Sequence, residues 1–169
     1  MHSRCVEIWT EVTIFMHLKC DPESYSDRLN LACGADYKDG WINQDFDDRV
    51  KADVYCDLDG ITLPFADASF NLIYASHILE HIHNLQDLKS ELYRILKPGG
   101  DLVCIVPHYL SVDAWGNPQH CRAFSLDSFK IRQFWPGEYL HIMQLFELNL
   151  KGENGYEAKW IISKRTKVA

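Results

Sequence analysis

Short apolar runs alternate with polar and turn-forming segments along most of the chain. From residue 28 onward these runs lie at Leu29–Ala32, Trp41–Ile42, Ala52–Cys56, Phe70–Ala75 and Leu102–Val106. Several are nearly continuous, which is typical of strands covered on both faces of a parallel sheet. Two more strands are predicted near Ile142–Leu150 and Tyr156–Ser163, with a hairpin turn at 152–155 between them.

One helix is predicted with clear ends. Its apolar positions recur at helical spacing: Leu85, Leu88, Leu92, Ile95 and Leu96. Asn84 is a good N-cap, with Asp87 three residues on, and Pro98-Gly99-Gly100 ends the helix before the strand at 102–106. Strand, helix, tight turn and strand make a βαβ unit, so the predicted fold class is α/β. A second short helix is expected near Leu126–Phe134.

The N-terminal part of the chain lacks this regular pattern. We therefore divide the chain into an N-terminal extension, 1–27, and a domain, 28–169. Residues 5–19 fit either a strand or one helical face, and their β-branched content favours a strand. Residues 21–27 are polar and are interpreted as a linker. No apolar run approaches the roughly 20 residues that span a bilayer, and no signal-peptide core is evident, so a cytoplasmic location is predicted.

Composition narrows the class of protein. A chain of 169 residues is the length of one domain. With 17 Lys and Arg against 24 Asp and Glu, the net charge of −7 gives no reason to expect a nucleic-acid or membrane partner. None of the six cysteines forms a Cys-x-x-Cys pair, so reduced thiols are predicted.

The candidate chemistry follows the predicted strands, because open parallel sheets bind ligands beyond their carboxyl ends. Neither a P-loop nor a G-x-G-x-x-G fingerprint is present, so a nucleoside without a pyrophosphate is the expected ligand. Asp45, or its neighbour Asp47, can accept both ribose hydroxyls. Asp57 can accept the adenine amino group while Leu58 packs on the ring. Each aspartate alone is better explained as a turn residue, and it is their order along the chain that favours a function.

Taken in order, these segments resemble the class I S-adenosylmethionine-dependent methyltransferase family, and most of all its small methyltransferase type 11 group. The matching segments are Asn30–Gly34, Asp45, Cys56–Leu58, Leu63–Asn71, Ala75–Ile82 and Leu96–Gly100. The resemblance spans about residues 28–130. It implies a Rossmann-like sheet, mostly parallel with an antiparallel C-terminal strand hairpin, and S-adenosyl-L-methionine as cofactor.

The resemblance also implies roles for individual residues. Asn30, Cys33 and Gly34 would border the methionine moiety. Asp45 would hold the ribose, Asp57 and Leu58 would contact the adenine, and Ser76 and His77 would lie near the sulfonium.

The chain departs from the family pattern in five places. Two of them are Asp36 in place of a further glycine and Asn71 in place of an aspartate. Asn30 replaces an acidic residue, and Ala32 replaces a glycine where the backbone approaches the ligand. The connection at 33–40 is shorter than a parallel crossover normally needs. The first helix is therefore expected to be reduced or absent.

The long polar and aromatic segment 107–125 is predicted to be a lid or an acceptor-binding loop. His108 and His120 are candidate bases because imidazole titrates near neutral pH, and Tyr109 is a candidate for positioning the acceptor. The alternative is that this loop is a structural cap. Asp113, Trp115 and Arg122 are further candidates for positioning the acceptor, and the same alternative applies to them.

The sequence contains two clusters of residue types that can bind metals. The first contains His77, Glu80, His81 and His83, but this segment matches a family motif that requires no metal. The second contains Cys104, His108, His120 and Cys121, whose spacing is poor for structural zinc. The prediction is therefore that the protein holds no metal.

The predicted function is in-line transfer of the sulfonium methyl group to an unidentified acceptor, with a small molecule or a glycan-type acceptor favoured. The alternative is a catalytically silent methyltransferase-fold protein that binds the cofactor or a partner. The altered first motif motivates this alternative.

Overall fold

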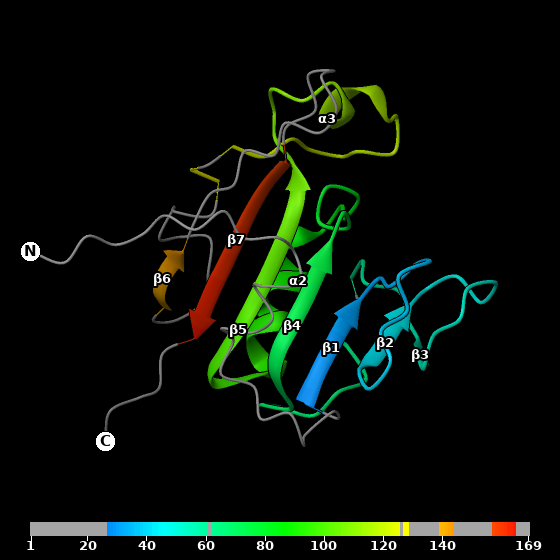
Figure 1. Ribbon diagram of the computed structural model, residues 1–169, viewed down its shortest axis with the longest axis vertical. Helices are drawn as coiled ribbons and strands as arrows, with labels where there is room; N and C mark the ends of the chain where they lie inside the picture. The colour runs from blue at the N-terminus through cyan, green and yellow to red at the C-terminus, as the bar shows by residue number, and fades with distance from the viewer. Residues whose placement is uncertain (1–26, 61, 126, 129–138, 144–156, 165–169) are drawn as a thin grey trace, which may run out of the picture.

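The computed structural model describes residues 27–60, 62–125, 127–128, 139–143 and 157–164. Its elements, in chain order, are β1 (Arg28–Leu31), β2 (Ile42–Asp45), β3 (Val54–Tyr55), β4 (Phe70–Ser76), α2 (Leu85–Ile95), β5 (Leu96–Pro107), α3 (Asp113–Gly116), β6 (Tyr139–Met143) and β7 (Glu157–Lys164). The strands form a single sheet in the order β3-β2-β1-β4-β5-β7-β6, as Figure 1 shows.

Strand direction divides the sheet into two parts. The five strands from β3 to β5 are all parallel to one another. β7 lies between β5 and β6 and runs antiparallel to both. The fold is therefore the expected Rossmann-like α/β sheet. The tight turn predicted at 152–155 lies outside the described residues.

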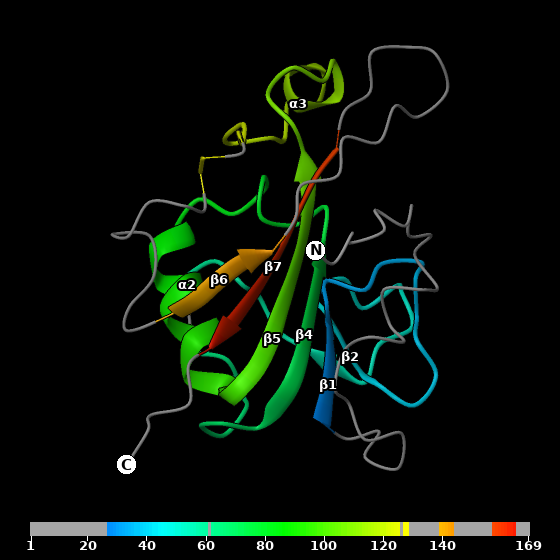
Figure 2. The ribbon, with the colours of Figure 1, turned by 60° about the vertical axis from the view of Figure 1, so that its left-hand side comes forward.

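Helix α2 covers one face of β4 and β5 (Figure 2). Its buried leucines and Ile95 pack with alternate residues of the central strands in the main core, among them Leu29, Leu31, Ile73, Leu102 and Cys104. The opposite face of the sheet carries a smaller apolar cluster of Leu72, Tyr74, Val103 and Ile105, with Trp41 packed against it. The central strands are thus apolar on both faces, which explains their nearly continuous apolar runs.

The start of α2 is stabilised by a residue distant in sequence. Asn84 is the N-cap residue, as predicted, but its side chain makes no capping hydrogen bond and donates instead to Asp87. The carboxylate of Asp59 accepts from the backbone N–H groups of His83, at 2.9 Å, and Asn84, at 2.7 Å. These bonds hold the pKa of Asp59 below its ordinary value. The prediction that Asn84 caps the helix together with Asp87 is therefore wrong. The carboxylate of Asp59 supplies the cap instead.

The end of α2 also differs from the prediction. The helix stops at Ile95, and β5 begins at once with Leu96, so Pro98-Gly99-Gly100 lies within the bounds of β5. Leu96 pairs with Phe70, and the regular pairing of β4 with β5 resumes at Asp101. Gly99 adopts a φ of 82°, which glycine tolerates without steric cost.

The first crossover contains no helix, which confirms the prediction that this helix is reduced or absent. Residues 32–41, all of them described, form turns between the parallel strands β1 and β2. Asn43, fully buried in β2, holds this connection. Its Oδ1 accepts from the backbone N–H of Lys38, and its Nδ2 donates to the carbonyl oxygens of Lys38 and Trp41. The buried Asn43 side chain thus holds this connection against the sheet, where a packed helix would otherwise do so.

Several predictions lie outside the described residues. They are the strand at 5–19, residues 21–26 of the linker and most of the helix at 126–134. Of the two described helices, α2 and α3, neither is long and apolar enough to cross a membrane.

Candidate functional site

The loop after β1 and the end of β2 are joined by a direct hydrogen bond. The backbone N–H of Gly34 donates to Oδ2 of Asp45 over 2.8 Å. Ala32 and Gly34 both adopt positive φ values, 50° and 51°, so the backbone turns sharply at the carboxyl end of β1. A Cβ atom added to Gly34 would meet nothing within 4 Å, so open space lies in front of this backbone. The predicted Gly34–Asp45 pair therefore faces a space that a ligand can enter.

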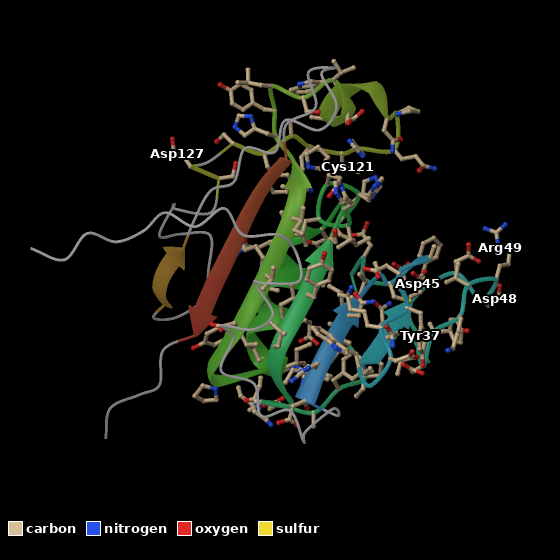
Figure 3. The ribbon with its side chains drawn as sticks, viewed as in Figure 1. Tyr37, Asp45, Asp48, Arg49, Cys121 and Asp127 are labelled. Atoms are coloured by element: carbon tan, nitrogen blue, oxygen red, sulfur yellow. The ribbon has the colours of Figure 1, made fainter. Side chains whose placement is uncertain are left out.

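The carboxylate of Asp45 is buried and already well supplied with donors. Its Oδ1 accepts from the backbone N–H groups of Phe46, at 2.8 Å, and Asp47, at 3.0 Å. A carboxylate offers about four lone-pair sites, and Gly34 takes one on Oδ2. Oδ2 is then the oxygen with room for one further donor. Two ribose hydroxyls cannot both be accepted here unless a backbone bond is displaced. Figure 3 shows Asp45 at the carboxyl end of β2.

Gln44 also shapes this edge, and the sequence analysis missed it. The side chain is fully buried. Its Oε1 accepts from the backbone N–H of Ala32, at 3.0 Å, and its Nε2 donates to the carbonyl of Cys56, at 2.6 Å. Gln44 thereby fixes the ends of β1 and β3 on either side of β2. The available signal was the polar run Asn43–Asp45 directly after the apolar Trp41–Ile42, because buried amides are retained where they satisfy backbone groups.

Asn30 and Cys33 point into the protein. Asn30 is buried, and its Nδ2 donates both hydrogens internally, to the carbonyl of Asp36 at 2.6 Å and to Oδ1 of Asn43 at 3.0 Å. The Cys33 thiol is buried, and burial followed by the charge of Asp45 raises its pKa. The Asn30 amide and the Cys33 thiol thus serve the loop, whereas the backbone at Gly34 faces the open space.

Leu58 and Asp57, the residues predicted to contact the adenine, differ in burial. Leu58 is buried in the main core, and Asp57 is exposed, with Oδ1 accepting from the backbone N–H of Asp59 at 2.9 Å. Asp47, the fallback for Asp45, is held by Arg49 through bonds of 2.7 and 2.8 Å that lower its pKa to about 2. These contacts leave Asp45 as the buried carboxylate at the end of β2.

Ser76 and His77 lie at the carboxyl end of β4, as predicted. His77 has a φ of 53°, uncommon for a non-glycine residue, and its backbone N–H donates to the carbonyl of Ile105 over 2.8 Å. Its side chain is half exposed, with Nδ1 3.5 Å from Oε1 of Glu80. Residues 77–84 form bends and turns, so the four-residue spacing of His77 and His81 is not a helical one.

The segment after β5 folds back over the edge of the sheet, with α3 beyond the strand ends in Figures 1 and 2. His108 is buried, and its Nδ1 accepts from the backbone N–H of Leu110 at 3.4 Å. Tyr109 is about half exposed, and its carbonyl accepts from the indole N–H of Trp115 at 2.7 Å. His108 therefore sits as a structural group, whereas Tyr109 is open to a ligand.

His120 lies elsewhere in this segment, beside the turn that follows β4. Its ring contacts the ring of His81, with centroids 4.7 Å apart and planes at 80°. The ligand atoms of Glu80, His81 and His120 lie within 4.8 Å of one another. The structure therefore separates the surroundings of the two predicted bases, His108 and His120.

The sequence itself matches a known family. Residues 23–104 match the family model described as a methyltransferase domain. The matched region contains β1 to β4, α2 and most of β5, and thus every predicted cofactor residue.

Curated relatives match over short segments. A 24-methylenesterol C-methyltransferase 2 from Oryza sativa subsp. japonica is 38% identical over 63 residues, which are 37% of this chain and 17% of the relative. A demethylmenaquinone methyltransferase from Corynebacterium efficiens is 48% identical over 44 residues, 26% of this chain and 19% of the relative. The matched segments thus span less than a third of these relatives' lengths.

Solved structures match the fold over most of the chain. A SAM-dependent methyltransferase from Archaeoglobus fulgidus superposes with a TM-score of 0.63 at 14% identity, covering 81% of this chain and 85% of that one. The YcgJ protein from Bacillus subtilis gives a TM-score of 0.60 at 15% identity, covering 90% and 97%. These solved structures share the fold of this chain, and together with the family-model match at 23–104 they support the predicted resemblance to class I S-adenosylmethionine-dependent methyltransferases.

Proposed function

We propose that this chain binds S-adenosylmethionine at the carboxyl edge of its sheet and transfers the methyl group to a small-molecule acceptor. The observation that carries the proposal is the Gly34–Asp45 hydrogen bond, which places a buried carboxylate beside backbone that faces open space. Oδ2 of Asp45 would accept one ribose hydroxyl. Asp57 and Ser76–His77, at the ends of the flanking strands, would line the same ligand.

S-adenosylmethionine supplies a methyl group already activated on a sulfonium, so its transfer is an in-line displacement. The chain's task is to align the two reactants and exclude water. A proton acceptor is needed only for a hydroxyl, amine or amide of high pKa. Tyr109 and His120 are the groups we propose for the acceptor side, because the side chain of His108 is buried.

The acceptor we propose has an apolar part. The segment after β5 exposes four large apolar side chains beyond the strand ends: Tyr109 (45% exposed), Leu110 (57%), Val112 (65%) and Trp115 (70%). Burying such side chains against a ligand is favourable by about 25 cal/mol per Å². The relatives named for sterol and menaquinone methylation support a small-molecule acceptor.

A labelled-methyl assay tests this function. The full chain is incubated with methyl-labelled S-adenosylmethionine and, separately, a phenolic quinol, a sterol and a hexose. We expect label on an apolar acceptor and a roughly tenfold lower kcat/KM for Trp115→Ala, with Asp127→Ala, an exposed residue in Figure 3, as control. Label on the hexose alone would overturn the acceptor class. Cofactor binding without label on any acceptor would favour the catalytically silent alternative.

A further inference from the structure

Glu80 is a buried carboxylate without a hydrogen-bond donor. It is 1% exposed, and neither Oε1 nor Oε2 has a hydrogen-bond partner among the described residues. An isolated carboxylate costs several kcal/mol to bury, so such a group is normally paired, protonated or bound to a metal. The side chains that neighbour Glu80 therefore indicate which of these three states applies.

Imidazole side chains surround this carboxylate, and Nδ1 of His77 lies 3.5 Å from its Oε1. His81 follows Glu80 directly in the turn after β4, and His120 lies across from both, with ligand atoms of the three residues within 4.8 Å of one another. Bonds of about 2.0–2.2 Å at tetrahedral angles put two ligand atoms of one zinc ion about 3.4 Å apart. The three atoms would have to move closer together to reach that spacing.

The tautomer of His120 suits metal binding. Its Nδ1 lies 3.3 Å from the carbonyl oxygen of Ala114. A carbonyl oxygen only accepts, so this contact favours the tautomer with the hydrogen on Nδ1, which leaves the lone pair of Nε2 for a metal. Metal-bound histidines usually donate the second ring N–H to such an oxygen, which fixes the ring.

The backbone around the cluster is tied together. The backbone N–H of Cys121 donates to the carbonyl of Glu80 over 2.7 Å, and Nη2 of Arg122 donates to the carbonyls of Ile82 and His83. These bonds hold His120 beside residues about 40 positions earlier in the chain. Figure 3 shows Cys121 beyond the carboxyl end of β4. Such fixed positions pre-organise ligands.

We propose that Glu80, His81 and His120 form a binding site for a divalent transition metal, with Zn²⁺ as the best fit. One carboxylate and two imidazoles are a ligand set that zinc accepts, and three protein ligands leave a fourth position for water or another molecule. In this site His120 binds the ion through Nε2 and is not a free base. With the ion bound, Tyr109 is the group that remains for the acceptor side. Metal binding is measured without cofactor or acceptor, so its failure is distinguishable from failure of the proposed function.

Zinc titration of the full chain tests the site. The protein is purified without a histidine tag, stripped with chelator and titrated calorimetrically with Zn²⁺. We expect one ion per chain, binding at least tenfold weaker in Glu80→Gln and His120→Ala, and unchanged binding in His83→Ala. His83 is the control because it is exposed and its Nδ1 contacts Asp59. Zn²⁺ should raise the Tm of the wild type and of His83→Ala only.

Two further readouts keep the test decisive. Glu80→Gln keeps the shape of the side chain and removes its charge, so the metal-free variant should unfold at or above the wild-type Tm. Co²⁺ in place of Zn²⁺ should show nitrogen and oxygen ligation. Absence of stoichiometric binding, equal affinity in Glu80→Gln and His120→Ala, or a thiolate-to-cobalt band that assigns the ion to Cys121 would each overturn the proposal.

Discussion

Gly34 and Asp45, 11 residues apart in sequence, meet where β1 and β2 end, with the Gly34 N–H 2.8 Å from Oδ2 of Asp45. The contact forms without an intervening helix, because buried amides of β2 fold the short connection onto the sheet. It positions both a carboxylate and an accessible stretch of backbone. The candidate cofactor site thus lies beside a connection that is shorter than a usual parallel crossover.

Gly34→Ala should weaken cofactor binding at least tenfold. A φ of 51° costs a non-glycine residue about 1–2 kcal/mol, and the added methyl group enters the open space before the loop. Calorimetric titration with S-adenosylhomocysteine measures the loss. Gly99→Ala is the matched control, with a φ of 82° at the amino end of β5. It should lower the Tm and leave the affinity unchanged, and equal losses of affinity in both variants would contradict the account.

Asp59→Ala should destabilise the fold by about 1–2 kcal/mol, because it leaves the N–H groups of His83 and Asn84 without their acceptor. Asn84→Ala should change stability by less than about 0.5 kcal/mol, since that side chain makes no capping bond. Urea unfolding at pH 7 compares the two. A larger loss of stability in Asn84→Ala than in Asp59→Ala would contradict this account and would indicate that the Asn84 side chain supplies the cap.

The Asp59 cap should also be sensitive to acid. The pKa of Asp59 is lower in the folded chain than its ordinary value. Its contribution is therefore complete above the ordinary value and is lost as the pH falls through the folded value. The stability gap between wild type and Asp59→Ala should stay constant from neutral pH down to the ordinary value of 3.8 and narrow as the pH falls below it. A gap that does not narrow in stronger acid would contradict this cause.

Lys89→Met should stabilise the protein at pH 7 by about 2 kcal/mol. Lys89 is 2% exposed, and burial, with a smaller effect of the Arg122 charge, lowers its pKa to about 8. Between pH 8 and the ordinary lysine value the unfolded chain binds more protons than the folded one, so wild-type stability rises with pH.

The stability advantage of Lys89→Met should accordingly shrink as the pH rises from about 8 to 10. Urea unfolding across this range measures it, with the exposed Lys51→Met as control. An advantage that does not change with pH would mean that the ammonium of Lys89 is not desolvated.

The sequence predicts the strands and the edge they share, because apolar runs and turn residues are local signals. The runs at 29–32, 70–75 and 102–106 all became central strands. Asp45 and Gly34 were identifiable as candidates because each follows a predicted strand, at the edge where open parallel sheets bind ligands. The β6–β7 strands agree in direction with the expected antiparallel end of the sheet.

The contacts that complete the site are not local, and the sequence analysis did not find them. Asn30 was predicted to border the cofactor, but its side-chain amide donates both hydrogens to Asp36 and Asn43. Asp59 caps a helix 25 residues later in the chain. His120 was grouped with cysteines near it in sequence, whereas folding places it beside Glu80. Only tertiary structure selects among such equivalent polar partners.

Binding of S-adenosylmethionine by wild type, Asp45→Ala and Asp48→Ala tests the central claim most directly. Asp48 is exposed on the loop after β2, near Asp45 in Figure 3, and is the matched control. Calorimetry should show micromolar binding to wild type and Asp48→Ala, and none to Asp45→Ala, whose folding is checked by its circular dichroism. Absence of binding to the wild type, or binding that survives in folded Asp45→Ala, would contradict a cofactor site built on Asp45.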